Sequence, residues 1–360
     1  MSDPKSARSF VASHLRDVPR SGIRDFFEIV SNRDDVISLS IGEPDFVTPW
    51  HIREASVYAI NRGATSYTDN LGLIKLRRAV CNYLERSCGL HYDPATETLI
   101  TVGVSEALDL AVRATIEPGD EVLFHQPSYV SYAPIVTFAR GVAVPVETRA
   151  DEDFRLTADR LQAAVTPRTK ALIVNFPTNP TGAVLTRADM EGLAAFAREH
   201  DILVITDEVY TELTYEGERL SIAAMPGMRE RTIYLNGFSK AWAMTGFRLG
   251  FACAPPELIE AMMKVHQYSI MCAPILSQEA ALEALARGDH DIDEMRDAYR
   301  RRRNFVCASL EEAGLPCHVP LASFYAFPYV GDFGLTSHEF SLRLLDEEQV
   351  ACVPGDAFGP

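Results

Sequence analysis

The sequence contains no apolar run long enough to cross a bilayer. Its first residues, Met1–Lys5, lack the charged and then apolar pattern of a signal peptide. Positive charge is also scarce, because 34 Lys and Arg residues stand against 50 Asp and Glu residues, a net charge of −16. This balance argues against nucleic acid and anionic membranes as general partners. It does not argue against a small anionic ligand, which would meet only its local site.

Cysteine is sparse and follows no pairing pattern. The seven cysteines include no C-x-x-C pair, and their number is odd. This pattern is not that of a disulfide scaffold or a zinc site, so we predict a protein of the reducing cytoplasm. The positions are Cys81, Cys88, Cys253, Cys272, Cys307, Cys317 and Cys352.

A strand–helix alternation fills the middle of the 360-residue chain, whose length suggests about two domains. The strands are short and continuously apolar, which is typical of a parallel sheet buried on both faces. We therefore predict an α/β fold, with its ligand beyond the carboxyl ends of the strands. Strands are predicted at 98–102, 121–125, 142–146, 171–175 and 202–206, and helices at 105–116, 129–139, 157–165 and 186–199.

The flanking regions read differently. Before the alternation we predict a helical arm at 10–32, a strand at 36–41, and helices at 50–62 and 73–88. After it we predict helices at 256–268, 276–288 and 292–313, then a small α+β segment with strands near 323–327 and 349–353. The basic run Arg300–Arg303 fits a solvated helix face better than a phosphate site, because acidic residues surround it.

Lys240 lies in a stretch of small and hydroxyl residues, Asn236–Gly250, between two apolar runs, which we interpret as a strand, a loop and a strand. A lysine held there can be partly desolvated, which lowers its pKa and frees the amine to attack an aldehyde. Arg248 follows, and its guanidinium suits a phosphate. Aldehyde and phosphate together indicate pyridoxal phosphate. Alone, the pair has an alternative interpretation as ordinary surface charges.

Two further loops follow predicted strands. Gly103–Ser105 opens a helix, and the amides of a helix N-terminus can hold phosphate. Asn179, in a turn that contains Pro180, could donate to a phenolic oxygen, and a cis bond before Pro180 would suit this turn. Each has a structural alternative, namely a helix cap and a tight turn.

Two more polar sites end predicted strands. Asp207 follows a strongly apolar strand, so its carboxylate needs a partner, which a protonated pyridine nitrogen would supply. Tyr210 could bond a ring oxygen, and Tyr129 could stack on the ring. Singly, these are a helix cap and core aromatics. Their coincidence at successive strand ends favours one site.

Together these motifs resemble those of the class I/II aminotransferases, pyridoxal-phosphate enzymes of fold type I. The resemblance covers nearly the whole chain, and the details are most similar to archaeal or bacterial aromatic or aspartate-type enzymes. The motifs are Ser40–Asp45, Tyr67 with Gly72, Gly103–Leu108, Asn179–Gly182, Asp207–Tyr210, Ser239–Lys240 and Met244–Arg248.

The resemblance implies roles for the residues around the ring. Lys240 would form the internal aldimine with pyridoxal 5'-phosphate and then move the substrate proton as acid and base. Asp207 would pair with the pyridine nitrogen, and both it and Tyr210 count with Lys240 as catalytic. Tyr210 and Asn179 would contact the ring oxygen, and Tyr129 would stack on the ring.

It also implies the surroundings of the ring. Tyr67 would reach the phosphate of a neighbouring subunit, so that a homodimer is the working unit. The Gly42 backbone, with Asn179, would contact the substrate. The remaining cofactor-binding residues would be Gly103, Val104, Ser105, Ser239 and Arg248.

Two departures from the family pattern stand out. Many members have a serine three residues before the lysine, where this chain has Gly237, so one phosphate contact would be missing. The family also continues past Val353–Gly359 into a motif whose arginine binds the substrate carboxylate, and this sequence stops at Pro360. Either the sequence is truncated or the carboxylate is bound otherwise. We expect the 360-residue chain to bind amino acids weakly and to keep its cofactor.

The implied activity is ping-pong amino transfer from an L-amino acid to a 2-oxo acid. A carbon–sulfur β-lyase on the same scaffold is one alternative. A ligand-sensing regulator is another, although no basic helical domain precedes residue 36. The region His266–Leu276 has no arginine for a second carboxylate, which favours aromatic or other apolar donors.

We also expect two domains. A large cofactor-binding domain would span residues 46–285. A small domain would combine residues 1–45 with 286–360.

Overall fold

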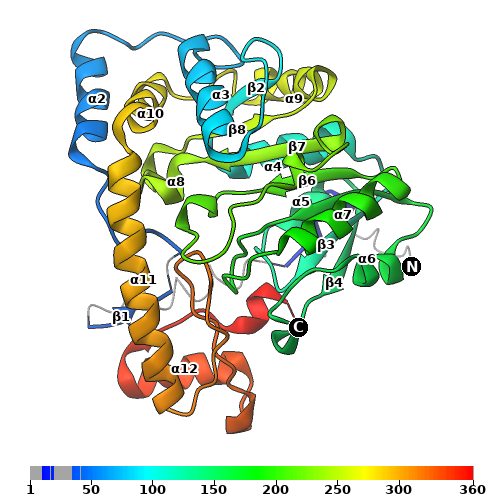
Figure 1. Cartoon of the computed structure of the whole chain (residues 1–360), viewed down its shortest axis with the longest axis vertical. Coiled ribbons are helices and arrows are strands. Elements are labelled where there is room, and N and C mark those ends of the chain that lie inside the picture. Colours follow the sequence, from blue (N-terminus) through cyan, green and yellow to red (C-terminus); the bar gives the residue numbers. More distant parts are fainter. Residues whose placement is uncertain (1–9, 17, 20–34, 41, 360) are drawn as a thin grey trace, which may run out of the picture.

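A mostly parallel sheet runs through the computed structural model (Figure 1), which describes residues 10–16, 18–19, 35–40 and 42–359. Within these residues the sheet has seven strands in the order β2-β8-β7-β6-β5-β3-β4, and β8 is antiparallel to both of its neighbours. The strands are β2 (Thr98–Thr101), β3 (Glu121–Gln126), β4 (Val142–Glu147), β5 (Thr169–Val174), β6 (Leu203–Asp207), β7 (Thr232–Gly237) and β8 (Gly250–Cys253). The predicted α/β architecture is confirmed.

Alternate residues of the central strands enter two different cores, as the two-residue period of a strand requires. Leu123 and Leu172 pack with α6 and α7 on one face, whereas Phe124 and Ile173 pack with α4, α5 and α9 on the other. The sheet is therefore covered on both sides, which explains why its strands are apolar throughout. These helices are α4 (Gly103–Thr115), α5 (Tyr132–Phe138), α6 (Ala158–Ala164), α7 (Arg187–Glu199) and α9 (Pro256–Ser269).

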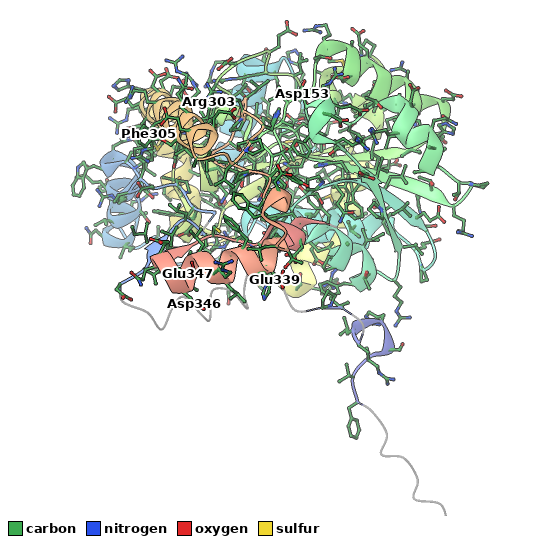
Figure 2. The ribbon with its side chains drawn as sticks, turned by 90° about the horizontal axis from the view of Figure 1, so that it is seen from below. Asp153, Arg303, Phe305, Glu339, Asp346 and Glu347 are labelled. Carbon is green, nitrogen blue, oxygen red and sulfur yellow. The ribbon has the colours of Figure 1, made fainter. Side chains whose placement is uncertain are left out.

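The remaining helices flank the antiparallel end of the sheet and the C-terminal part of the chain. A third core joins α3 and α10 to β7 and β8 through side chains such as Leu76, Trp242 and Phe251. Helix α11 runs down one side of the molecule from α10 towards α12 (Figure 1), and Figure 2 shows Glu339 and Glu347 on α12 at the lower rim. The helices are α2 (Trp50–Asn61), α3 (Ile74–Cys88), α8 (Phe238–Ala241), α10 (Ile275–Arg287), α11 (Asp289–Glu312) and α12 (Ser337–Glu348).

A second, two-stranded sheet joins distant parts of the chain. Strand β1 (Ile37–Ser38) pairs in parallel with β9 (Val350–Ala351), so both predicted strands form, although they are shorter than predicted. Of the helical arm predicted over 10–32, the described residues form one 3-10 turn, Ser13–Leu15, and residues 17 and 20–32 lie outside them. None of the described helices is long and apolar enough to span a membrane.

The strand predicted at 323–327 is wrong. In this region only isolated bridges link Thr214 to Ala322 and Cys317 to Pro328 among the described residues. Its aromatic residues are typical of a strand, but the backbone amides here bond to turns instead, since Ala322 donates to the Gly182 carbonyl and Ser323 to the Leu213 carbonyl. The segment is thereby held against the carboxyl ends of β5 and β6.

Candidate active site

A cleft of about 1850 Å³ opens at the carboxyl ends of the parallel strands. It is bounded by strand-end loops on one side and by α11 and the segment 320–328 on the other. Most of the residues predicted for the site line it. They are Gly42, Val104, Ser105, Tyr129, Asn179, Asp207, Tyr210, Ser239, Lys240 and Arg248.

Lys240 reaches the cleft from α8, a single helical turn directly after β7, and not from the loop that we predicted. Its Nζ donates a hydrogen bond to the Gly42 carbonyl oxygen. The pKa of this amine is lowered to about 8, mainly by burial and also by the nearby Arg248, whereas Glu43 and Asp207 act in the opposite direction. A neutral amine is therefore accessible close to physiological pH, as nucleophilic attack requires.

This pKa gives a prediction for the cofactor-free protein. The neutral fraction of the Lys240 amine should pass one half near pH 8, because a depressed pKa leaves the amine protonated only below that value. Acylation of Lys240, followed by peptide mass spectrometry across a pH series, would measure it. The same peptide in denatured protein should reach half-reactivity roughly two units higher, near the ordinary lysine pKa of about 10.4. Equal profiles for folded and denatured protein would contradict the prediction.

Asp207 ends β6 and is buried, at 6% exposure. The Tyr132 hydroxyl donates to Oδ2 at 3.0 Å and the Val209 amide to Oδ1 at 3.3 Å, while the Asn175 side-chain amide donates to the Asp207 carbonyl oxygen at 2.7 Å. Burial nevertheless raises the carboxyl pKa to about 6, against these hydrogen bonds and the charge of Lys240. The ionised carboxylate is thus under-compensated, and a cationic ring nitrogen would supply what it lacks.

The Asn179 amide is only half-partnered. Its Nδ2 donates to the Tyr325 hydroxyl at 3.3 Å. Its Oδ1, which can only accept, is buried with no hydrogen-bond partner among the described residues. Tyr210 lies beside it, with its hydroxyl 2.6 Å from that of Tyr325. The Nδ2 group carries a second N–H, for which the described residues show no acceptor, and a ring oxygen entering the cleft could accept from it. The cis bond predicted before Pro180 is confirmed, and those before Pro127 and Pro177 were not predicted.

The opposite end of the cleft has the features of a phosphate site. Gly103 opens α4 with a φ of +76°, and a Cβ there would lie 2.8 Å from Nη2 of Arg248, so the guanidinium rests against this glycine. The first amides of α4 and the arginine thus face the same space, which is a suitable arrangement for a dianion. Glu106 fixes the turn, because one of its carboxylate oxygens accepts from the Val102 amide at 2.5 Å and the other contacts His266 Nδ1 at 2.7 Å.

The departure at Gly237 has a packing reason. A Cβ at this position would lie 2.8 Å from Cγ2 of Val104 and 3.0 Å from Cα of Gly250. The space that a serine side chain would need is filled by the same loop that opens α4. At this position the close contact with Val104 and Gly250 therefore takes the place of a hydroxyl.

Three predicted residues need separate description. Tyr129 precedes α5, which begins at Tyr132 and not at 129 as predicted, and its ring meets that of Tyr132 edge-to-face at 5.7 Å. Ser239 is buried next to Lys240. Tyr67 is 82% exposed and lies outside the cleft of its own chain.

Sequence reasoning missed Tyr132, Asn175 and Tyr325. Asn175 closes the predicted strand at 171–175, so its position at a strand end was a usable signal. Tyr132 would have required the correct start of α5. No pattern in the sequence pointed to Tyr325, which a segment without regular secondary structure brings into the cleft.

Taken together, these groups fit pyridoxal phosphate. The cleft offers an amine of lowered pKa, an under-compensated carboxylate and a side-chain amide with a second N–H that can donate, together with an arginine beside a helix N-terminus. These groups match the aldehyde, the ring nitrogen, the ring oxygen and the phosphate, respectively.

Comparison with known proteins agrees with this chemistry. The family model "Aminotransferase class I and II" matches residues 34–360. The chain is 47% identical to an aspartate aminotransferase of Pyrococcus abyssi and 45% identical to aromatic-amino-acid aminotransferase 2 of Thermococcus litoralis, in each case over 97% of this chain and 90% of the relative. A crystal structure of the aromatic aminotransferase from Pyrococcus horikoshii superposes with a TM-score of 0.89 at 46% identity, covering 94% of this chain and 91% of that one. The expected fold type I architecture is thereby confirmed.

Proposed function

Because the chain belongs to the class I and II aminotransferases, we propose that it transfers the amino group of an L-amino acid to a 2-oxo acid by a ping-pong mechanism, using pyridoxal 5'-phosphate held by Lys240. One observation carries the proposal. The Lys240 amine, the Asp207 carboxylate and the Arg248 guanidinium line a single cleft at the carboxyl end of the sheet. An amino acid leaves as its 2-oxo acid, and a second oxo acid then takes up the amino group.

Each end of the cleft would hold one part of the cofactor. The Gly103–Ser105 turn and Arg248 would bind the phosphate, and Ser239 would lie beside it. Tyr129 would stack on the ring. Asp207 would face the ring nitrogen, held in orientation by the bonds from Tyr132 and Val209.

When bound, the cofactor supplies a conjugated cationic ring that draws electrons from the substrate α-carbon. The residues of this chain would do the remaining work. Lys240 would carry the proton from the α-carbon, since its pKa of about 8 leaves it able both to take and to give a proton near neutral pH. Asp207 would keep the ring nitrogen protonated, and Asn179 and Tyr210 would fix the ring oxygen.

The substrate would enter beside the Gly42 backbone, whose carbonyl contacts Lys240 Nζ. Asn179 would assist in holding the substrate. The relatives include enzymes named for aspartate and for aromatic amino acids. We place this chain nearer the aromatic type, because the region 266–276 offers no arginine for a second carboxylate.

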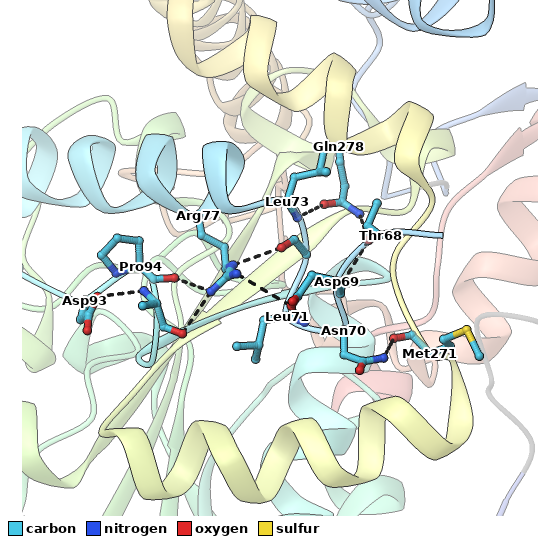
Figure 3. A network of polar contacts seen from close by, with 12 residues as sticks. Thr68, Asp69, Asn70, Leu71, Leu73, Arg77, Asp93, Pro94, Met271 and Gln278 are labelled. Carbon is cyan, nitrogen blue, oxygen red and sulfur yellow. Dashed lines mark hydrogen bonds and ion pairs between the residues drawn. The ribbon is translucent and has the colours of Figure 1, made fainter. Parts of the chain in front are cut away.

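We further propose a homodimer in which Tyr67 reaches the partner's site. The loop after Tyr67 is rigidly held (Figure 3): Gln278 accepts from the Leu73 amide at 2.7 Å, and Arg77 donates to the carbonyls of Gly72 and Pro94 at 3.1 and 2.6 Å. A fixed loop that carries an 82% exposed tyrosine fits a residue with its function on another chain.

The surface around this loop supports the same proposal. Asn70 donates to the Met271 carbonyl at 2.8 Å, so the loop lies against the residues that follow α9 (Figure 3). Tyr268, in the last turn of that helix, is 88% exposed. Trp50 and Tyr58 are also exposed, on the neighbouring α2. Exposed aromatic residues in such number are typical of an interface.

The two-domain division stays a proposal, with residues 46–285 as the large domain and 1–45 with 286–360 as the small one. It is supported by the pairing of β1 with β9, which unites the two ends of the proposed small domain. Seven free thiols support a cytoplasmic location.

An amino-donor panel tests the proposal. Purified protein with pyridoxal phosphate and 2-oxoglutarate should form glutamate, fastest with aromatic donors. Failure with every donor and oxo acid, at concentrations high enough to overcome the weak amino-acid binding that we expect, would refute the proposal. Release of pyruvate and ammonia from cysteine-type substrates without an oxo acid would instead identify a lyase.

A further inference from the structure

Tyr325 places a hydroxyl at the centre of the cleft, where no role has been assigned. Its Oη lies 2.6 Å from the Tyr210 hydroxyl and 3.3 Å from the Asn179 amide nitrogen. A Cβ on Gly42 would lie 2.7 Å from the same oxygen. One phenol therefore touches both the residues proposed for the ring oxygen and the glycine whose backbone is proposed to contact the substrate.

The ring of Tyr325 is held firmly. It packs against Phe324 at 4.8 Å between centroids and meets the Tyr210 ring edge-on at 5.7 Å. Burial raises the pKa of both phenols, so each keeps its proton at neutral pH. Because the ring packing fixes its place, losing the hydroxyl alone would leave the site's shape intact.

The two phenols and the amide share a limited number of protons. Tyr325 accepts from the Asn179 amide, which leaves its own proton for Tyr210. The contact between the two hydroxyls allows either to donate, and with Tyr325 as the donor Tyr210 accepts and keeps its own proton free. We propose that Tyr325 is a positioning residue that relays a hydrogen bond from Asn179 to Tyr210, so that the Tyr210 hydroxyl donates into the cleft. This inference rests on the proposed function, because the acceptor is the ring oxygen of the bound cofactor.

Such a chain strengthens its last bond, because each donation polarises the next hydroxyl. A strong hydrogen-bond donor to the ring oxygen would reduce the negative charge near the Lys240 nitrogen. Protonation of that nitrogen would then be less favourable, so its pKa would be lower. The charges that act on Lys240 are those of Glu43, Arg248 and Asp207, and removing the Tyr325 hydroxyl changes none of them. A change in protonation would therefore report on the hydrogen-bond chain itself.

The experiment measures the pH midpoint of the visible absorbance of the cofactor-loaded protein. Tyr210→Phe should raise the midpoint by about one to two units, since a hydrogen bond to a charged group is lost. Tyr325→Phe should raise it by about half a unit, because it weakens that bond without removing it. The double variant should match Tyr210→Phe alone, because Tyr325 acts through Tyr210.

Tyr92→Phe is the matched control. Tyr92 is a buried tyrosine outside the cleft, and its hydroxyl has no hydrogen-bond partner within the described part of the chain. The pH midpoint of the Tyr92→Phe variant should therefore equal that of the unmodified protein. An unchanged midpoint in Tyr325→Phe, or shifts that add in the double variant, would overturn the relay and leave the proposed function standing. If the unmodified protein binds no cofactor, the relay and the proposed function both fail.

Discussion

Replacing Lys240 with alanine is expected to lower the rate of amino transfer by a factor of about 10⁴ or more. The substitution removes both the amine that would hold the cofactor and the group that would move the proton. No other lysine lines the cleft among the described residues. Steady-state kinetics with saturating cofactor would measure the loss.

The Lys240→Arg substitution tests whether the site needs a free amine or only a positive charge. Arginine keeps the positive charge but stays protonated at any accessible pH, so it offers no free amine. We expect this variant to be as inactive as the alanine variant. Lys264→Ala serves as a control, because Lys264 is exposed and pairs with Glu260 on the surface. A Lys240→Arg enzyme that kept a tenth of the normal rate would show that charge alone suffices.

The sequence could predict those site residues whose positions follow from the sheet. Residues 202–205 are apolar and Asp207 is charged, so the end of β6 is visible without a structure. The carboxyl ends of parallel strands meet at one edge, which brings Asn179 and Asp207 together although the order of the strands was unknown. For these residues, local pattern and global fold agree.

Other features depended on information that a local pattern does not hold. Helix α8 is only four residues long, too short to show a helical period, so Lys240 was assigned to a loop. The aromatic residues of 323–327 are typical of a strand, but the neighbours of this segment in space are the turn at Gly182 and the residues around Leu213. Tyr325 reaches the cleft through those long-range contacts. Its place is a tertiary effect that overrides local preference.

Asp207→Asn should lower the rate of amino transfer by roughly 10²- to 10⁴-fold, because the amide is neutral and cannot hold a proton on the ring nitrogen. The shape of the side chain is preserved, and one oxygen remains to accept from Tyr132 or Val209. Kinetics on cofactor-loaded protein would measure the effect. A variant with near-normal kcat would refute the role proposed for this carboxylate.

Glu208→Gln is the control for this substitution. Glu208 is the adjacent buried carboxyl, and burial raises its pKa to about 8, so it is mostly neutral at pH 7 and the amide changes little charge. Both of its hydroxyl donors, Ser221 and Thr206, bond to Oε1, which glutamine retains. It does not line the cleft. Near-normal activity in this variant would tie the loss to Asp207 and not to any buried acid in the motif.

Asp207→Asn should raise the stability of the cofactor-free protein, although it lowers the activity. The folded pKa of Asp207, about 6, lies above its ordinary value of 3.8, so folding disfavours the ionised form and the penalty is fully present above pH 6. Asp207→Asn removes that penalty and loses about one hydrogen bond, which leaves a net gain of about 1–2 kcal/mol at pH 7. The gain should shrink as the pH falls from about 6 through 3.8, because Asp207 is protonated in both states only below its ordinary pKa of 3.8. Thermal melts of both proteins across this range would measure the gain.

A residue whose replacement stabilises the fold and removes the activity is kept for its chemistry. A variant that is less stable at pH 7 would indicate that Asp207 serves the fold instead.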